Sequence, residues 1–285
     1  MKIDKACVEC IINQSVKVSI AIHADKELTR KIVSGVTLKS KDFSFDDTPP
    51  EIASYIYKYM SEVADKEDLY EDIKRLSTKK ANSFLPKLQD KVKNSKDKLL
   101  TATKIAVAGN VIDLAAEVEF DLHEELDKIF DTRFDIDDFD TMKDKLSNAK
   151  DVVILGDNVG EHIFDYLFIQ TLKELYPNAN YHYFVRGCPI INDVTLQEAK
   201  EAGFDKLCNL VDSGVDTPGF TYKRATDKAK ELFDSADLII SKGMGNYECL
   251  SPSHRSDICF LLKVKCEVVA SSLKAKIGDI VCKIS

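Results

Sequence analysis

The sequence predicts an α/β protein in which a helical first part is followed by a mostly parallel β-sheet. Both observations behind this prediction concern the spacing of apolar residues. Before about residue 150 they recur at the helical interval of three to four residues. After it, short apolar runs alternate with amphipathic stretches. Such alternation is typical of βαβ units, whose strands are parallel.

Helical patterns dominate the first part. The segment 49–64 opens on two prolines, which suit the first turn of a helix, and its apolar residues line one face. Pro86 is expected to interrupt the helical pattern in which it lies. Further helices are predicted at 68–88, 99–118 and 140–150.

The mixed-charge stretch at 87–98 is predicted to be a solvated helix face or a linker. It marks the expected boundary between a helical N-terminal domain at 1–98 and an α/β domain at 99–285. The helices between 99 and 150 fit either side of this boundary.

Five apolar runs in the second part predict buried strands. A sixth strand is expected after the Gly278-Asp279 turn, and helical patterns at 160–176 and 196–203 separate the earlier runs. The five runs lie at 151–158, 181–187, 206–214, 236–243 and 259–265.

Composition narrows the class of protein. The chain has 285 residues, of which 44% are hydrophobic and 31% charged, as in a globular protein. Its formal net charge is −8 and its lysines are interspersed with acids, which argues against a nucleic-acid partner. No apolar run is long enough to cross a bilayer, and no secretory signal is evident. We therefore expect a cytoplasmic protein whose eight cysteines are reduced.

Polar residues follow the predicted strands, where open α/β sheets bind ligands. Asp157 and Asn158 follow the first run, and Asp193 lies beyond the second. Carboxylate and amide oxygens suit Mg²⁺, Mn²⁺ or a similar ion, so these three residues form a candidate metal site. The alternative is that Asn158 caps a helix in which Glu161 completes a capping box.

The segment KGMGNYE after the fourth run (242–248) has the composition of a phosphate site. Gly243 and Gly245 allow backbone N–H groups to approach an anion, while Lys242 and Asn246 add a charge and an amide donor. The alternative is a tight turn between a strand and a helix. Lys265, at the end of the fifth run, is a further candidate for the same crevice.

Other phosphate-binding and hydrolytic motifs are absent from the sequence. It contains no Gly-x-Gly-x-x-Gly fingerprint, no Walker motif and no Gly-x-Ser-x-Gly elbow. An acid at the turn after the first strand would also repel a pyrophosphate. Carboxylates for a metal and donors for a phosphate at one sheet edge indicate metal-dependent phosphoryl transfer or hydrolysis.

Several segments together resemble the damage-control phosphatase family: GDNVGE, INDVT, SGVDTPG, KGMGNYE and LLKVKC, preceded by CVECIINQ. The N-terminal Cys-x-x-Cys resembles its mainly prokaryotic and archaeal subfamily. The resemblance implies a helical N-terminal part packed on a three-layer α/β/α domain. It also implies a divalent metal (Mn²⁺, Co²⁺, Ni²⁺ or Mg²⁺) and hydrolysis of small phosphorylated metabolites.

Residue by residue, the resemblance makes Asp157, Asn158 and Asp193 the metal ligands. It assigns catalysis to Asp157 and Lys242, and leaves open whether Asp157 or a metal-bound water attacks phosphorus. The sugar-phosphate branch has Arg-Thr-x-Lys where this chain has Leu262-Lys263-Val264-Lys265, which keeps only the final lysine. Substrate contacts are expected from Glu161, Gly243, Gly245, Asn246 and Lys265.

Cys7 and Cys10 leave a second hypothesis open. A zinc site usually needs a second pair of ligands, and a redox pair usually follows a strand, so packing, metal binding and redox chemistry all stay possible. The alternative function is a non-catalytic metal- or ligand-binding or redox module. No histidine is assigned to catalysis, and His162 is expected on a helix surface.

Overall fold

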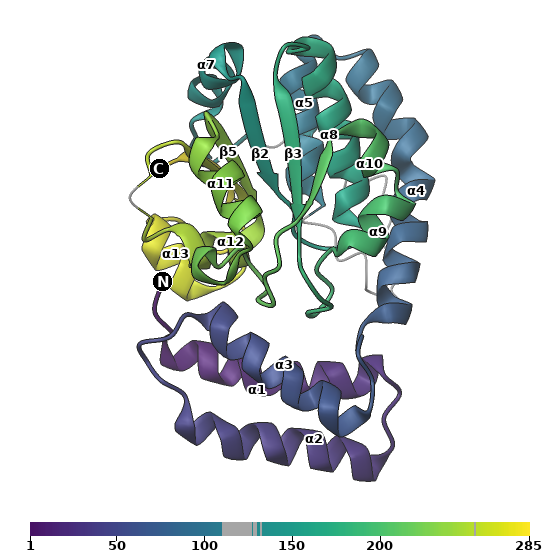
Figure 1. Cartoon of the computed structure of the whole chain (residues 1–285), viewed down its shortest axis with the longest axis vertical. Helices are drawn as coiled ribbons and strands as arrows, with labels where there is room; N and C mark the ends of the chain where they lie inside the picture. Colours follow the sequence, from purple (N-terminus) through teal and green to yellow (C-terminus); the bar gives the residue numbers. More distant parts are fainter. Residues whose placement is uncertain (110–126, 128–129, 132, 254) are drawn as a thin grey trace.

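The computed structural model describes residues 1–109, 127, 130–131, 133–253 and 255–285. A layer of three helices lies at one end of an α/β part, beyond the tips of the strand arrows in Figure 1. The helices are α1 (Lys5–Ala21), α2 (Lys26–Lys39), α3 (Pro49–Ala64), α4 (Glu71–Lys93), α5 (Lys98–Ala108), α7 (Phe139–Asn148), α8 (Glu161–Leu175), α9 (Leu196–Glu201), α10 (Phe204–Leu207), α11 (Asp227–Ser235), α12 (Gly243–Leu250) and α13 (Glu267–Leu273).

The sheet has seven strands in the order β1-β7-β6-β5-β2-β3-β4. All neighbouring pairs are parallel except β6 and β7, which are antiparallel. The mostly parallel sheet predicted from the sequence is therefore confirmed. The strands are β1 (Ile136–Asp137), β2 (Asp151–Leu155), β3 (Asn180–Val185), β4 (Asn209–Asp212), β5 (Leu238–Lys242), β6 (Ile258–Lys263) and β7 (Ile280–Ile284).

Both faces of the sheet are buried, which makes the α/β part a three-layer structure. Successive side chains of a strand point to opposite faces, so Val152 and Ile154 of β2 enter one core with α4, α5 and α8. Val153 and Leu155 enter the other core with α11 and α13. This explains why the strand sequences are continuous apolar runs rather than alternating ones.

The helical layer has a core of its own, formed by buried residues between Ile3 and Tyr70. Ile73, near the start of α4, packs against this core, but Ala81, Leu88 and Val92 of the same helix pack into the core that covers the sheet. The packing thus changes near residue 70, ahead of the boundary expected at 98. The predicted helix at 99–118 corresponds to α5, and its part beyond residue 109 lies outside the described residues.

Pro86 lies inside α4, which runs through it to Lys93. The expectation that this proline interrupts the helix is therefore wrong. Packing accounts for the difference, since α4 contacts both α5 and α8. Tertiary packing outweighs the local cost of a proline, which is about 3 kcal/mol in a helix interior.

Polar contacts join the helical layer to the α/β part. Lys74 is almost fully buried, and its ammonium lies 2.8 Å from Asp68 and 2.6 Å from Glu198 of α9. On the other side of the layer, Lys223 forms an ion pair with Glu51 of α3. These contacts fix α1–α3 over the carboxyl ends of the strands, where Figure 1 shows them.

Helix α3 begins with a capping box. The Thr48 hydroxyl accepts from the Glu51 N–H, and the Glu51 carboxylate accepts from the Thr48 N–H at 3.0 Å. Replacing Thr48 by alanine should lower the free energy of unfolding by about 1 kcal/mol, because an N–H of the first turn loses its acceptor. Urea unfolding measures this. Thr37→Ala, on the exposed face of α2, is the control and should change the value by less than about 0.5 kcal/mol; equal losses would contradict the prediction.

No helix among the described residues is both long and apolar enough to cross a membrane.

Candidate functional site

Asp157 and Asn158 follow β2 directly and are held by backbone pairing with the segment after β3. The Val159 N–H donates to the Asn192 carbonyl at 2.8 Å, and the Val194 N–H donates to the Asp157 carbonyl at 2.9 Å. This pairing places Asn158 opposite Asp193. The structure thus brings together the three residues expected to bind the metal.

Asn158 is not the cap of the helix that follows. Helix α8 begins at Glu161, and its N-cap residue is Gly160, whose φ of 96° favours glycine. The Asn158 amide instead donates to the Asp157 carboxylate at 3.2 Å and to the Glu161 carboxylate at 3.0 Å. The capping-box alternative for Asn158 is therefore wrong, and the amide links two acids of the site.

Asp193 is held by a buried arginine. The Arg186 Nε donates to the Asp193 Oδ2 at 2.7 Å, and both side chains are almost fully buried. Arg186 stands at the end of β3, and its terminal nitrogen also lies 3.4 Å from the Asn246 amide oxygen. The sequence analysis did not identify Arg186, although it is the charged residue that closes an otherwise apolar run.

Lys242 ends β5 and is fully buried. Its ammonium lies 2.5 Å from the Asp165 Oδ1, and Asp165 is fully buried as well. Burial lowers the pKa of Lys242, but the charges of Asp165, Glu161 and Asp157 outweigh this effect and leave the pKa above its ordinary value. Lys242 is thus a fixed cation beside the acids of the site. Asp165, about one turn into α8, was not among the residues singled out in the sequence.

The Gly243 backbone approaches the Asp157 carboxylate closely. A Cβ at Gly243 would lie 1.9 Å from the Asp157 Oδ2, and Gly243 also has a φ of 77°. At Gly245, a Cβ would lie 2.0 Å from the Pro218 carbonyl oxygen. Both glycines are therefore required by close contacts, and Gly243 brings the first turn of α12 against the candidate metal site.

Asn246 holds the loops of the site together. Its amide donates to the carbonyls of Gly156 at 3.0 Å and Lys242 at 2.7 Å, and its oxygen accepts from the Phe220 N–H at 2.7 Å. These contacts fix the ends of β2 and β5 relative to each other. The same contacts occupy the Asn246 amide donors, which the sequence analysis expected to contact substrate. The substrate-binding role of Asn246 stays a prediction.

Glu161 and Asp193 have strongly shifted pKa values. Burial, followed by the charge of Asp157, raises the pKa of Glu161 to about 8. Burial also raises the pKa of Asp193 to about 7, because the opposing charge of Arg186 only partly offsets it. Lys265 is exposed, and its charge acts on Glu161 from the edge of the site.

Buried acidic side chains are concentrated at this sheet edge. Among the described residues, four buried carboxyl groups lie here together with the buried cations Lys242 and Arg186. A cation bound by the acids would favour their ionised forms, which burial disfavours. The four acids are Asp157, Glu161, Asp165 and Asp193.

The chemistry of the donors fits a hard divalent ion that keeps part of its coordination for water or substrate. The candidate ligand set consists of two carboxylates and one amide. In the part of the chain that the structure describes, no three His, Cys, Asp or Glu side chains are grouped as a complete metal-binding set.

His162 is fully buried, so its expected surface position is wrong. The Gly160 N–H donates to the His162 Nδ1 at 2.9 Å, and burial lowers the pKa of the imidazole to about 4. The ring also stacks on Phe204. His162 is therefore a neutral core residue that supports the turn between β2 and α8.

Cys7 and Cys10 lie on α1. Both are free thiols, Cys7 half-buried against the core of the helical layer and Cys10 exposed. Burial raises the pKa of each thiol, which disfavours the reactive thiolate. The geometry gives no support to a redox role.

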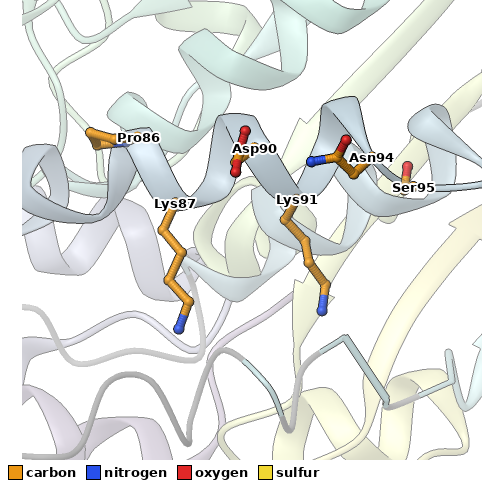
Figure 2. Close-up of a pocket in the computed structure, with 6 residues that line it drawn as sticks. All are labelled: Pro86, Lys87, Asp90, Lys91, Asn94 and Ser95. Carbon is orange, nitrogen blue, oxygen red and sulfur yellow. The ribbon is translucent and has the colours of Figure 1, made fainter.

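Two large cavities lie beside the described elements. One of about 830 Å³ borders the site, because its lining includes Arg186, Gly187 and Cys188 after β3 together with Lys74 and Glu198. Figure 2 shows the other, of about 840 Å³, which runs along α4 and includes none of the predicted site residues. Its lining is Pro86, Lys87, Asp90, Lys91, Asn94 and Ser95.

The fold and the site define a class of protein: an α/β protein with a mostly parallel sheet and an acidic site at the carboxyl ends of its central strands. Residues 3–281 match the damage-control phosphatase ARMT1-like domain. The chain is 32% identical over 284 residues to a damage-control phosphatase of Pyrococcus horikoshii, covering 99% of this chain and 98% of the relative. It is 31% identical over 290 residues to a damage-control phosphatase of Archaeoglobus fulgidus, covering 100% and 99%.

A solved structure agrees with these matches. The crystal structure of a DUF89 family protein from Pyrococcus horikoshii superimposes with a TM-score of 0.91 at 32% sequence identity. The match covers 100% of this chain and 99% of that one. The chain belongs to the ARMT1-like damage-control phosphatase family, and the resemblance found in the sequence is confirmed.

Proposed function

We propose that the protein is a divalent-metal-dependent phosphatase that hydrolyses phosphate monoesters of small metabolites. Membership of a family whose relatives are named phosphatases supports a hydrolase. The observation that carries the metal dependence is the backbone pairing of 157–159 with 192–194. It gathers Asp157, Asn158 and Asp193 beside the Gly243 turn.

Asp157, Asn158 and Asp193 are the residues that would hold the metal, which we expect to be Mn²⁺, Co²⁺, Ni²⁺ or Mg²⁺. A bound divalent ion would supply Lewis-acid stabilisation of the negative charge on the phosphoryl oxygens. Arg186 holds Asp193 in place, and the Asn158 amide holds Asp157 and Glu161. The ligands are thus fixed before substrate binds.

Side chains and backbone groups of the chain would bind the phosphate. The first N–H groups of a helix have no partner within it, and α12 presents this end beside Asp157. Lys242 provides a buried positive charge close to Asp157 and Glu161, and Lys265 provides an exposed one. The helical layer lies over the strand ends in Figure 1, and the cavity beside Arg186 offers space for the rest of the substrate.

The test is phosphate release from an aryl phosphate and from a panel of sugar and cofactor phosphates. Metal-stripped protein is titrated with each of the four ions. We expect turnover that depends on metal and is lost in Asp157→Ala, because the Asp157 carboxylate is a proposed metal ligand and lies against the Gly243 turn. Asp193→Asn should weaken metal binding by at least about tenfold, as expected when a ligand loses its charge.

Asp140→Asn is the matched control, since Asp140 is an exposed carboxylate on α7 at the far end of the sheet. It should behave like the unchanged protein. Tight metal binding without turnover on any substrate would overturn the phosphatase proposal and leave a metal-binding module. Full activity after chelation would overturn the metal dependence.

A further inference from the structure

Three buried polar side chains from three elements form a chain of contacts beneath the site. Tyr183 of β3 donates its hydroxyl to the Asp165 Oδ2 at 3.0 Å, and the Asp165 Oδ1 lies 2.5 Å from the Lys242 ammonium. All three residues are fully buried. Such groups are costly to bury unless each is satisfied, so their arrangement calls for a functional reason.

We propose that Asp165 is a positioning residue that, with the Tyr183 hydroxyl, fixes the ammonium of Lys242 at the phosphate site. The inference rests on the proposed phosphatase function. It assigns to Asp165 no contact with substrate, because Asp165 acts through Lys242.

The structure holds Asp165 in place from two sides. Asp165 follows Glu161 by four residues on α8, so both carboxylates point from the same face of the helix. The ring of its partner Tyr183 stacks on the Phe204 ring, with centroids 4.2 Å apart. The Tyr183 hydroxyl also lies under Gly156, where a Cβ would approach it to 2.6 Å.

Fixing the lysine matters because its side chain is flexible. A free lysine loses up to about 2 kcal/mol of rotamer entropy when it is held in one orientation. An ammonium has three N–H donors, and the Asp165 carboxylate accepts one of them. Because Asp165 holds Lys242 in one orientation, the rotamer entropy of the lysine is already lost on folding and not when phosphate binds.

The test is a double-mutant cycle with Asp165→Asn and Lys242→Met, read out as kcat, KM and inhibition by inorganic phosphate. Asp165→Asn keeps the shape of the side chain and removes its charge. We expect it to lower kcat/KM about 10- to 100-fold, the effect of losing a hydrogen bond to a charged group. It should weaken inhibition by phosphate to a similar extent and leave Mn²⁺ affinity unchanged.

The decisive readout is coupling. In the Lys242→Met background, Asp165→Asn should have no further effect on kcat/KM or on phosphate inhibition, because the residue through which it acts is gone. Effects that add in the double variant would overturn the proposal. So would Asp165→Asn with unchanged kcat/KM and unchanged phosphate inhibition.

If Asp165→Asn does not fold, Tyr183→Phe tests the same role. It removes only the hydroxyl that donates to Asp165 and keeps the packed ring. It should weaken phosphate inhibition in the unchanged background and not in Lys242→Met; equal effects in both would contradict the inference. Absence of turnover in the unchanged protein would instead refute the proposed function. Calorimetric binding of inorganic phosphate to the same variants would then decide the positioning role.

Discussion

Replacing Gly243 by alanine is expected to lower metal-dependent phosphate release by about a hundredfold or more. The new Cβ would lie 1.9 Å from the Asp157 Oδ2 and 2.4 Å from its Cγ, so the carboxylate must move. A displacement of about 1 Å in a catalytic group can cost about a hundredfold in rate. The substitution removes no functional group, and any loss therefore reports on the geometry of Asp157.

Gly278→Ala is the matched control for this experiment. Gly278 also has a positive φ, of 100°, but a Cβ there meets no atom within 4 Å. Both variants carry the backbone strain of alanine in a left-handed conformation, about 1 kcal/mol or more, and only Gly243→Ala carries the clash. Initial rates and thermal unfolding are measured for both. Equal activity in the two variants would show that Asp157 does not depend on the approach of Gly243.

Replacing Arg186 by methionine is expected to lower the free energy of unfolding by about 3–5 kcal/mol in metal-stripped protein. The substitution leaves the Asp193 carboxylate buried without its guanidinium partner, and a buried charge that loses its partner is strongly destabilising. Urea unfolding measures the loss. Adding Mn²⁺ should restore part of it if Asp193 is a metal ligand, because binding to the folded state stabilises it.

Arg75→Met provides the comparison. Arg75 pairs with Asp72 at 2.9 Å, but the two side chains are 73% and 62% exposed. Exposed ion pairs contribute little, so this variant should lose about 0.5 kcal/mol or less. Losses of similar size in Arg186→Met and Arg75→Met would contradict the role given to Arg186.

The parallel sheet and its strand ends could be predicted from the sequence because both depend on local patterns. The runs 151–158 and 236–243 have unbroken apolar stretches at 152–155 and 238–240, as expected for strands buried on both faces. Strands β2 and β5 lie within these runs. Chain topology then brings polar residues at strand ends to one edge. This placed Asp157 and Asp193 in one site without any knowledge of their contacts.

The residues that the sequence analysis missed owe their roles to distant partners. Asp165 looks like an ordinary helical acid until the fold sets it against Lys242, 77 positions away. His162 follows a charged residue at the start of a helix, yet α8 is buried on nearly all sides. The proline at 86 is tolerated for a similar reason. In each case, burial set by the tertiary structure outweighs what neighbouring residues suggest.

Ile190 lies in the loop that carries Asp193 and is buried in the core of the helical layer. The segment between β3 and α9 therefore contacts two separate parts of the molecule. Ile190 packs into the core formed by residues 3–70, and the backbone of 192–194 pairs with the turn after β2. Such contacts join regions far apart in the chain, which slows folding. We expect the loop to become ordered late in folding. The site would then form only after the first seventy residues have folded. A cavity in the core of the helical layer, such as one made by Ile56→Ala, should then raise the rate of hydrogen exchange in the 190–194 loop before the sheet unfolds.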